Sequence, residues 1–256
     1  MHLLIIDAMN LIRRMYAAMA DHENKEQACA HRCVSAIADM VGKLEASHCT
    51  VVFEEKELTW RHQLWPDYKK GRSPMPQALH DSLHLFKEAF IEAGFLPFKF
   101  KSWEADDVIA SLACKAAYHG LAVTVVSTDK GFFQIADERI QILNYFDRKL
   151  YSLTEIEQRY GVAIDQLIDL WGLTGDTTNH LPGVAGIGIK TATQLLHQFG
   201  DLDNLLIQKQ QTGLSDKLSK ALDDQWQSAL LTRKLIKLVQ NLPLGVNLHQ
   251  MRIKKP

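Results

Sequence analysis

The sequence predicts an α/β protein with a mostly parallel sheet and flanking helices, followed by a helical part without strands. Short apolar runs rich in β-branched residues predict strands at 3–6, 50–53, 123–126 and 140–143. Longer stretches with apolar residues three and four positions apart predict helices at 28–46, 77–93 and 105–119. Because strands and helices alternate, we expect parallel strands covered on both faces.

The strand pattern ends after about residue 152, where glycines begin to separate helical stretches. These glycines are Gly161, Gly172, Gly175, Gly183, Gly186, Gly188 and Gly200. We therefore expect an α/β domain at residues 1–155 and a helical domain at 156–256, with a boundary near 152–160 and no long linker.

Composition excludes few functions. The chain has 256 residues, 46% of them hydrophobic, enough for one large domain with a helical addition. Its net charge of −1 neither supports nor excludes nucleic-acid binding, because carboxylates that hold metal can balance basic residues that hold phosphate. The apolar run at residues 3–6 meets Asp7 and is too short for a signal or membrane segment.

The four cysteines form no recognisable disulfide framework. Cys29, His31 and Cys33 resemble half of a zinc site, but no second ligand pair follows at suitable spacing. Cys29 and Cys33 are four residues apart in a predicted helix, so we interpret them as core residues. We expect the protein to work in the reducing cytoplasm.

Acidic residues follow three predicted strands: Asp7, Glu54 and Asp129. The carboxyl ends of parallel strands meet at one edge of a sheet, where ligands bind. Glu104 and Asp106 open the helix that leads to the third of these strands. Each acid alone fits a turn or a helix N-terminus, but together they favour a Mg²⁺ or Mn²⁺ site.

One geometric condition attaches to this site. On a regular helix, residues two apart point about 200° away from each other, so Glu104 can share a metal with Asp106 only if it precedes the helix. No Ser/His/Asp arrangement or Walker-type loop is present, and Asp7 lacks the second Asp of an aspartyl-phosphate phosphatase. Metal-activated water is therefore the favoured chemistry.

Residues 181–192, LPGVAGIGIKTA, predict a phosphate-binding hairpin. Gly186 and Gly188 let the backbone approach a phosphate at the start of a helix, and Lys190 and Thr191 follow with a charge and a hydroxyl. An ordinary glycine turn would share single features, but the whole string matches the helix-hairpin-helix of DNA-binding nucleases. Such a module grips phosphates without reading bases.

Basic and aromatic residues are mixed in the segment between the predicted strands at 50–53 and 123–126. Trp60, Arg61 and His62 are followed by Tyr68-Lys69-Lys70-Gly71-Arg72. This composition suits single-stranded nucleic acid, with charges along phosphates and rings on bases. A solvated surface loop would have a similar composition, and both interpretations stay open.

Taken together, these motifs resemble the bacterial 5′-nuclease family, which includes the 5′-nuclease domain of DNA polymerase I. They occur in the family's order at residues 4–7, 52–54, 61–72, 104–107, 127–130 and 173–190. The resemblance implies a PIN-like nuclease domain, a helical arch over the active site and a helix-three-turn-helix module.

The resemblance also implies residue roles. The positions of the first metal site are Asp7, Glu54, Glu104, Asp106 and Asp129, and the basic residues at the base of the arch are Lys69 and Arg72. Main-chain carbonyls that hold a potassium ion in the family correspond to Leu173, Thr174, Pro182, Val184 and Ile187. The DNA contacts correspond to Gly186, Ile187, Gly188, Ile189, Lys190 and Thr191.

Three positions depart from the family pattern. Glu54 replaces an aspartate, Gly131 stands where the family has an acid, and Asn179 replaces the second aspartate of the G-D-x-x-D-N motif. The second metal site therefore keeps Asp176 and loses two carboxylates, while the first is nearly whole.

We therefore expect a monomeric, structure-selective 5′-3′ nuclease that hydrolyses flapped or branched DNA with Mg²⁺ or Mn²⁺, and that binds K⁺ in its hairpin. One alternative is a DNA-junction binding protein whose nuclease site has decayed. Another is a PIN-type ribonuclease, against which the hairpin argues because it implies a duplex DNA arm.

Overall fold

The computed structural model describes residues 1–54, 58–208 and 214–253, which form two compact units. Unit 1 comprises Met1–Thr59, Ser73–Tyr151 and Val239–Pro256, and unit 2 comprises Trp60–Arg72 and Ser152–Leu238. These units differ from a simple division at residue 155, because residues 60–72 belong with the helical part and the C-terminal segment returns to the sheet.

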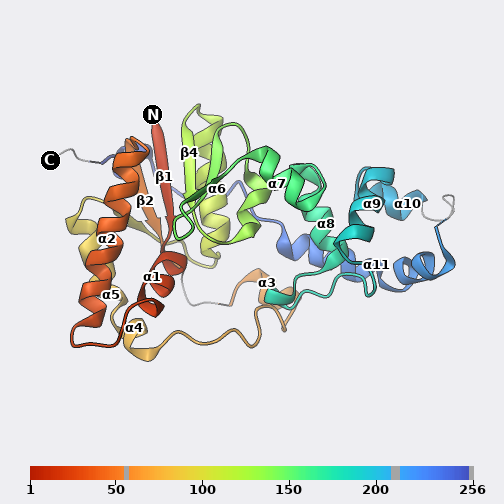
Figure 1. Cartoon of the computed structure of the whole chain (residues 1–256), viewed down its shortest axis with the longest axis horizontal. Helices are drawn as coiled ribbons and strands as arrows, with labels where there is room; N and C mark the ends of the chain where they lie inside the picture. Colours follow the sequence, from red (N-terminus) through yellow and green to blue (C-terminus); the bar gives the residue numbers. More distant parts are fainter. Residues whose placement is uncertain (55–57, 209–213, 254–256) are drawn as a thin grey trace. The chain divides into compact units, whose positions relative to one another are not determined.

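Unit 1 is built on a six-stranded sheet with the order β3-β2-β1-β4-β5-β6, in which all neighbours are parallel except β5 and β6. Figure 1 labels β1, β2 and β4. The strands are β1 (His2–Asp7), β2 (His48–Val52), β3 (Leu96–Phe98), β4 (Ala122–Val126), β5 (Ile140–Asn144) and β6 (Lys149–Tyr151). The central strand β1 pairs with both β2 and β4, placing Asp7 opposite Val52 and Ile6 opposite Val126. The predicted α/β class and all four predicted strands are confirmed.

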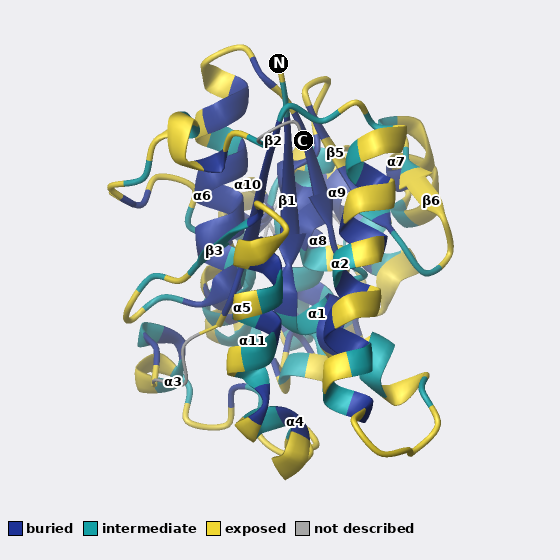
Figure 2. Ribbon diagram, turned by 90° about the vertical axis from the view of Figure 1, so that its left-hand side faces the viewer, coloured by how far each residue is buried: buried dark blue, intermediate teal, exposed yellow. Residues whose placement is uncertain are grey.

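Helices cover both faces of this sheet. They are α1 (Ala8–Ala17), α2 (Lys25–Lys43), α4 (Gln77–Asp81), α5 (Leu83–Glu92) and α6 (Ala105–Tyr118). Leu4 and Ile6 share a core with α1, α2 and α5, whereas α6 packs on β1, β2 and β4. Because side chains alternate along a strand, burial on both sides accounts for the continuous apolar run of β1, and Figure 2 shows this strand dark blue between the helices.

Two strands and one helix break were not predicted. β3 and β6 have three residues each, too few for a periodic pattern, and β3 contains Pro97, which suits its place at the sheet edge. The helix expected at 77–93 is interrupted at Ser82, whose hydroxyl donates to the carbonyl of Leu79 over 3.0 Å.

Unit 2 is helical. Its elements are α3 (Trp60–Leu64), α7 (Leu153–Tyr160), η2 (Ile164–Gln166), α8 (Leu167–Thr174), η3 (Thr177–Asn179), α9 (Ile189–Phe199), α10 (Leu202–Gln208) and α11 (Asp216–Ile236). Ser152 starts the unit with a capping box, accepting from the backbone N–H of Glu155 while Glu155 accepts from Ser152. Beyond Tyr151 the described residues contain no further strand, as predicted.

The described residues around Lys69 and Arg72, which the resemblance places at the base of a helical arch, contain little helix. α3 and α4 have five residues each, and residues 65–76 between them form turns and irregular chain. Within the described ranges, no helix combines the length and the apolar character that crossing a bilayer requires. Cys29 and Cys33 are buried, in agreement with their interpretation as core residues; Cys49 is also buried, Cys114 is half-buried, and all four cysteine thiols are free.

Candidate active site

The sheet brings three predicted acids to one edge of unit 1. Asp7 ends β1, Glu54 follows β2 by two residues, and Asp129 follows β4 by three. Because β1 pairs with both β2 and β4, these three side chains leave neighbouring strands at their carboxyl ends.

Asp7 is the buried member of this group, with 7% of its surface exposed. Its Oδ1 accepts from the Asn10 backbone N–H at 3.1 Å, and its Oδ2 accepts from the Ser127 hydroxyl at 2.8 Å. Burial raises the pKa of Asp7 from its usual 3.8 to about 6, and the nearby charges of Asp129 and Glu54 also raise it. The carboxylates are close enough to repel one another, which is the condition a bound cation relieves.

This raised pKa predicts a pH dependence of stability in the metal-free protein. Protonation of Asp7 favours the folded state, so the stabilisation is complete below about pH 4 and is lost as the pH rises through about 6. We expect Asp7→Asn to remove this dependence and to stabilise the protein at pH 7 by at most about 3 kcal/mol. Denaturant unfolding in a chelator at pH 4.5 and pH 7 measures it; parallel pH profiles for both proteins would contradict the expectation.

Glu104 and Asp106 are positioned at the N-terminus of α6. Glu104 is the N-cap of α6 and has extended backbone angles, so it precedes the helix as joint metal ligation with Asp106 requires. Glu104 is buried and accepts from the Thr59 hydroxyl at 3.3 Å, and Asp106 lies half-buried in the first turn. Asp107 differs from both, since its Oδ1 accepts from the backbone N–H of Val239 at 2.9 Å and anchors the returning C-terminal segment.

The donor chemistry at this edge fits a hard divalent cation. Carboxylate oxygens are the ligands of Mg²⁺ and Mn²⁺, and burial, with a smaller contribution from repulsion by Asp129 and Glu54, raises the pKa of Asp7. Among the described residues, however, no group of three or more His, Cys, Asp or Glu side chains is gathered closely enough to hold a metal ion. The acids therefore lie at one edge of the sheet, but the described side chains do not form a complete coordination shell for a metal ion.

Gly131 lies directly against one of these acids. Its backbone N–H donates to Asp129 Oδ1 at 2.7 Å, capping the short helix η1 (Lys130–Ile135). A β-carbon at position 131 would lie 3.1 Å from the same oxygen. An acidic side chain at this position therefore requires Asp129 to shift by a few tenths of an ångström.

Arg61 fits neither interpretation of the basic segment, nucleic-acid contact or solvated loop. Its side chain is 1% exposed, and it donates through Nε to the carbonyl of Leu235 at 2.7 Å and through Nη2 to that of Lys237 at 3.1 Å. These carbonyls lie at the C-terminal end of α11, where a cation also offsets the helix dipole. Arg61 therefore has a structural role inside unit 2.

Two other basic residues of this segment are accessible. Lys69 is half-buried with its Nζ 5.2 Å from the ring centre of Tyr68, and Arg72 is exposed. Arg72 Nη2 donates to Asn179 Oδ1 at 2.5 Å, and Asn179 Nδ2 donates to Asp176 Oδ2 at 2.5 Å. The structure thus brings together Arg72 and Asp176 within unit 2, joined through the asparagine that departs from the family motif.

The glycine hairpin is shaped by contact between backbones. Gly175 and Gly183 both have positive φ, and a β-carbon on Gly183 would lie 2.6 Å from the carbonyl carbon of Thr174 and overlap the nitrogen of Gly175. Val184 N–H donates to the Leu173 carbonyl at 2.8 Å, and Ile187 N–H donates to the Val184 carbonyl at 3.0 Å. The end of α8 and the hairpin therefore lie against each other, as a shared carbonyl site requires.

Helix α11 supports the same hairpin from one side. Gln225 Oε1 accepts from the Ala185 N–H at 2.9 Å, and Thr232 Oγ1 accepts from the Gly183 N–H at 3.4 Å. α9 begins after Gly188, which caps it without a side chain, and leaves Lys190 exposed. The predicted buried face of this helix, Ala192, Leu195, Leu196 and Phe199, is confirmed.

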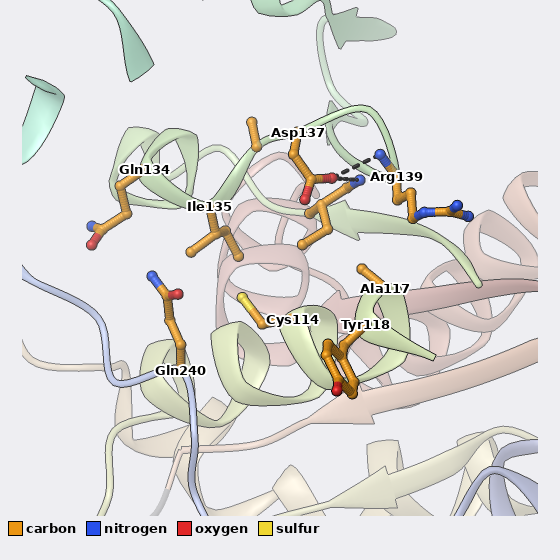
Figure 3. A pocket seen from close by; sticks show the side chains of 10 residues that line it. Cys114, Ala117, Tyr118, Gln134, Ile135, Asp137, Arg139 and Gln240 are labelled. Carbon is orange, nitrogen blue, oxygen red and sulfur yellow. Dashed lines mark hydrogen bonds between the residues drawn. The ribbon is translucent and has the colours of Figure 1, made fainter. Parts of the chain in front are cut away.

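A cavity of about 560 Å³ in unit 1 lies elsewhere (Figure 3). Its lining includes Cys114 and Tyr118 from α6 together with Asp137, Arg139 and Ile140 at the start of β5, and none of the predicted acids. It therefore lies toward the edge where the strands begin, away from their carboxyl ends.

Three supporting residues were missed by reasoning from the sequence. Ser127 bridges two acids, donating to Asp7 and accepting from the Asp129 N–H at 3.1 Å, and Asn10 bonds Thr128 across the strand ends. The sequence motif identifies Asn179 only as a lost carboxylate. Short polar residues beside the acids were the available signal for Ser127 and Asn10, whereas nothing in the sequence pairs Asn179 with a residue of the distant basic segment.

A parallel sheet with acids at the ends of neighbouring strands, together with a glycine hairpin that opens a helix, defines a nuclease of the α/β type. The family descriptions "5′-3′ exonuclease, N-terminal resolvase-like domain" and "5′-3′ exonuclease, C-terminal SAM fold" match residues 2–161 and 162–256. The chain belongs to the 5′-3′ exonuclease family.

Known relatives cover almost the whole chain. A flap endonuclease Xni from Aeromonas hydrophila subsp. hydrophila is 42% identical over 255 residues, covering 98% of this chain and 95% of the relative. One from Colwellia psychrerythraea is 39% identical over 269 residues, covering 98% and 92%. A T5 5′-exonuclease solved with zinc shares the fold, with a TM-score of 0.79, 23% identity and coverage of 93% of this chain and 90% of that one. A bacteriophage T5 flap endonuclease solved with DNA and metal ions has a TM-score of 0.78 and 24% identity, with the same coverage.

Proposed function

We propose that the protein is a structure-selective 5′-3′ nuclease that hydrolyses phosphodiester bonds of flapped or branched DNA with Mg²⁺-activated water. The observation that carries this proposal is the meeting of Asp7, Glu54 and Asp129 at one sheet edge, where burial and then the charges of the two neighbours raise the pKa of Asp7. Support also comes from relatives called flap endonuclease Xni, about 40% identical over nearly the full length.

The residues that would hold Mg²⁺ or Mn²⁺ are Asp7, Glu54, Glu104, Asp106 and Asp129. When bound, the metal would lower the pKa of a coordinated water and offset charge on the phosphate. Asn10 and Ser127 fix the Asp7 carboxylate through both of its oxygens, and Thr59 fixes Glu104. These hydrogen bonds orient the ligands before a metal arrives.

The remaining predicted residues would hold the DNA. The exposed cation of Arg72, with Lys69, would contact phosphates of the bound DNA. The hairpin from Gly186 to Thr191 would grip backbone phosphates of a duplex arm through N–H groups and Lys190. The carbonyls of Leu173, Thr174, Pro182, Val184 and Ile187 would hold K⁺ beside one of those phosphates.

We further propose that nuclease chemistry belongs to residues 1–155 and duplex binding to 156–256. The protein would act as a monomer in the cytoplasm. Four free thiols suit a reducing compartment.

A second candidate function is DNA-junction binding without cleavage. It is favoured by the absence, within the described ranges, of a closed group of metal-binding side chains, and by Gly131 and Asn179 in place of acids. Incubation of a 5′-flap DNA with chelator, Mg²⁺ or Mn²⁺ separates the two: we expect cleavage only with metal. Binding without metal-dependent products would favour the second function, and equal cutting of an RNA flap would favour a ribonuclease.

Potassium is expected to tighten DNA binding several-fold relative to equal concentrations of sodium or tetramethylammonium chloride. A cation held by hairpin carbonyls adds positive charge beside a phosphate, whereas bulk salt weakens all binding alike. Binding isotherms at matched ionic strength measure this. Lys190→Ala is the control, since it should lower the salt dependence but leave the potassium-to-sodium ratio unchanged. Identical isotherms in the three salts would remove the proposed potassium site.

A further inference from the structure

The turn from Asp176 to Leu181 is the anchor of the basic segment in unit 2. Trp65 Nε1 donates to the His180 carbonyl at 2.9 Å, and Lys69 N–H donates to the Asn179 carbonyl at 3.1 Å. Tyr68 packs in the same buried cluster as Leu181. The backbone that leads to Arg72 is therefore fixed before the side chain is considered.

The side chain of Asn179 then connects two charged groups. A guanidinium only donates hydrogen bonds and a carboxylate only accepts them, so the amide must turn its oxygen to Arg72 and its nitrogen to Asp176. An aspartate at position 179 could accept from Arg72 but would place a second carboxylate against Asp176. The amide is therefore suited to join this arginine to this acid.

Asp176 is itself held in place. Its Oδ1 accepts from the backbone N–H of Thr178 at 2.8 Å and of Asn179 at 3.4 Å, which leaves Oδ2 for the amide. The chain of contacts thus runs from a capped turn, through Asp176 and Asn179, to an exposed guanidinium. An arginine side chain loses much rotamer freedom when it binds a phosphate. A contact that already restrains the side chain lowers the conformational entropy lost on binding.

We propose that Asn179 is a positioning residue that fixes the guanidinium of Arg72 for a DNA phosphate. The proposal rests on the proposed function, in which Arg72 contacts DNA. It assigns Asn179 a role distinct from that of the carboxylate it replaces: it orients a cation of the protein and binds no metal.

The chain contains a matched control for this arrangement. Asn204 N–H donates to Asp201 Oδ1 at 2.7 Å and Asn204 Nδ2 donates to Asp201 Oδ2 at 2.9 Å, which repeats the local Asp–Asn turn. No arginine contact is found at Asn204 in the described part of unit 2. Asn204→Ala therefore removes a similar turn without touching the basic segment.

The test measures flap-DNA affinity against salt concentration for Asn179→Ala, Arg72→Ala, the double variant and Asn204→Ala. Arg72→Ala should weaken binding and lower the salt slope by about one. Asn179→Ala should weaken binding about two- to tenfold with an unchanged slope, because the arginine is still present but less restrained. In the Arg72→Ala background, Asn179→Ala should weaken binding no further. Asn179→Gln should recover affinity for the flap DNA. Asn204→Ala should bind the flap DNA like the wild type.

The outcomes separate the two proposals. If Arg72→Ala changes neither affinity nor slope, the proposed DNA contact of Arg72 fails. If Arg72→Ala weakens binding but Asn179→Ala does not, or weakens it equally in both backgrounds, the positioning role fails while the DNA contact stands. Melting curves confirm that each variant is folded, and Asn179→Ser replaces the alanine variant if that one is not.

Discussion

Asp106→Ala is expected to lower metal-dependent cleavage of a flapped DNA by about a thousandfold or more, while flap binding stays equal or becomes tighter. A carboxylate ligand holds the metal, whose contribution amounts to several kcal/mol of transition-state stabilisation. Without metal the same carboxylate repels phosphate, so its removal does not weaken binding. Single-turnover cleavage with Mg²⁺ and binding in a chelator measure the two effects.

The neighbouring acid supplies the control. Asp107 is fully buried and accepts from the Val239 N–H, so Asp107→Ala should lower the free energy of unfolding by about 1–3 kcal/mol. Below its melting temperature this variant should still cut within a few-fold of the wild-type rate. Undiminished cleavage by Asp106→Ala would exclude this carboxylate from the site.

Gly183→Ala is expected to destabilise unit 2 by about 3–4 kcal/mol and to abolish duplex binding through the hairpin. Residue 183 has a φ of +58°, which an L side chain adopts at a cost, and the new methyl group would overlap the backbone of Gly175. Separation of the two backbones would strain the hydrogen bond between Val184 N–H and the Leu173 carbonyl. Thermal unfolding followed by circular dichroism measures the loss.

Gly186→Ala separates the cost of a positive φ from the cost of steric overlap by the new methyl group. Gly186 also has a positive φ, at +86°, but a β-carbon there would meet no atom within 4 Å. We expect this variant to lose only about 1 kcal/mol, the cost of the backbone conformation. Equal destabilisation by the two substitutions would show that the packing of Gly183 on Gly175 contributes little to the hairpin.

The sequence was sufficient for the central part of the fold. β1, β2 and β4 are long enough and apolar enough for their burial to fix both their position and the edge at which Asp7, Glu54 and Asp129 meet. The same reasoning failed for β3 and β6, because a three-residue edge strand takes its conformation from its neighbour.

Side-chain roles were harder to predict than strands. Arg61 lies in a basic and aromatic segment whose composition suits nucleic-acid binding. Its hydrogen-bond partners, however, are main-chain carbonyls more than 170 residues away, which no local sequence pattern reveals. The contact between Arg72 and Asn179 likewise joins residues 107 positions apart. By contrast, the extended backbone of Glu104 followed from a geometric requirement that could be stated in advance.

The anchoring of Val239 on Asp107 has a consequence for the order in which the protein can mature during synthesis. The segment from Val239 also bonds Ser111, through the Val239 carbonyl at 2.8 Å and the Leu242 N–H at 3.2 Å, and Arg252 forms an isolated antiparallel β-bridge with His48, the first residue of β2. The helix that presents Asp106 therefore obtains these partners only after all of unit 2 has been translated. All five acids proposed to hold metal lie before residue 130 and are translated before the hairpin, but the helix that carries Asp106 is fully anchored only after the hairpin has been made.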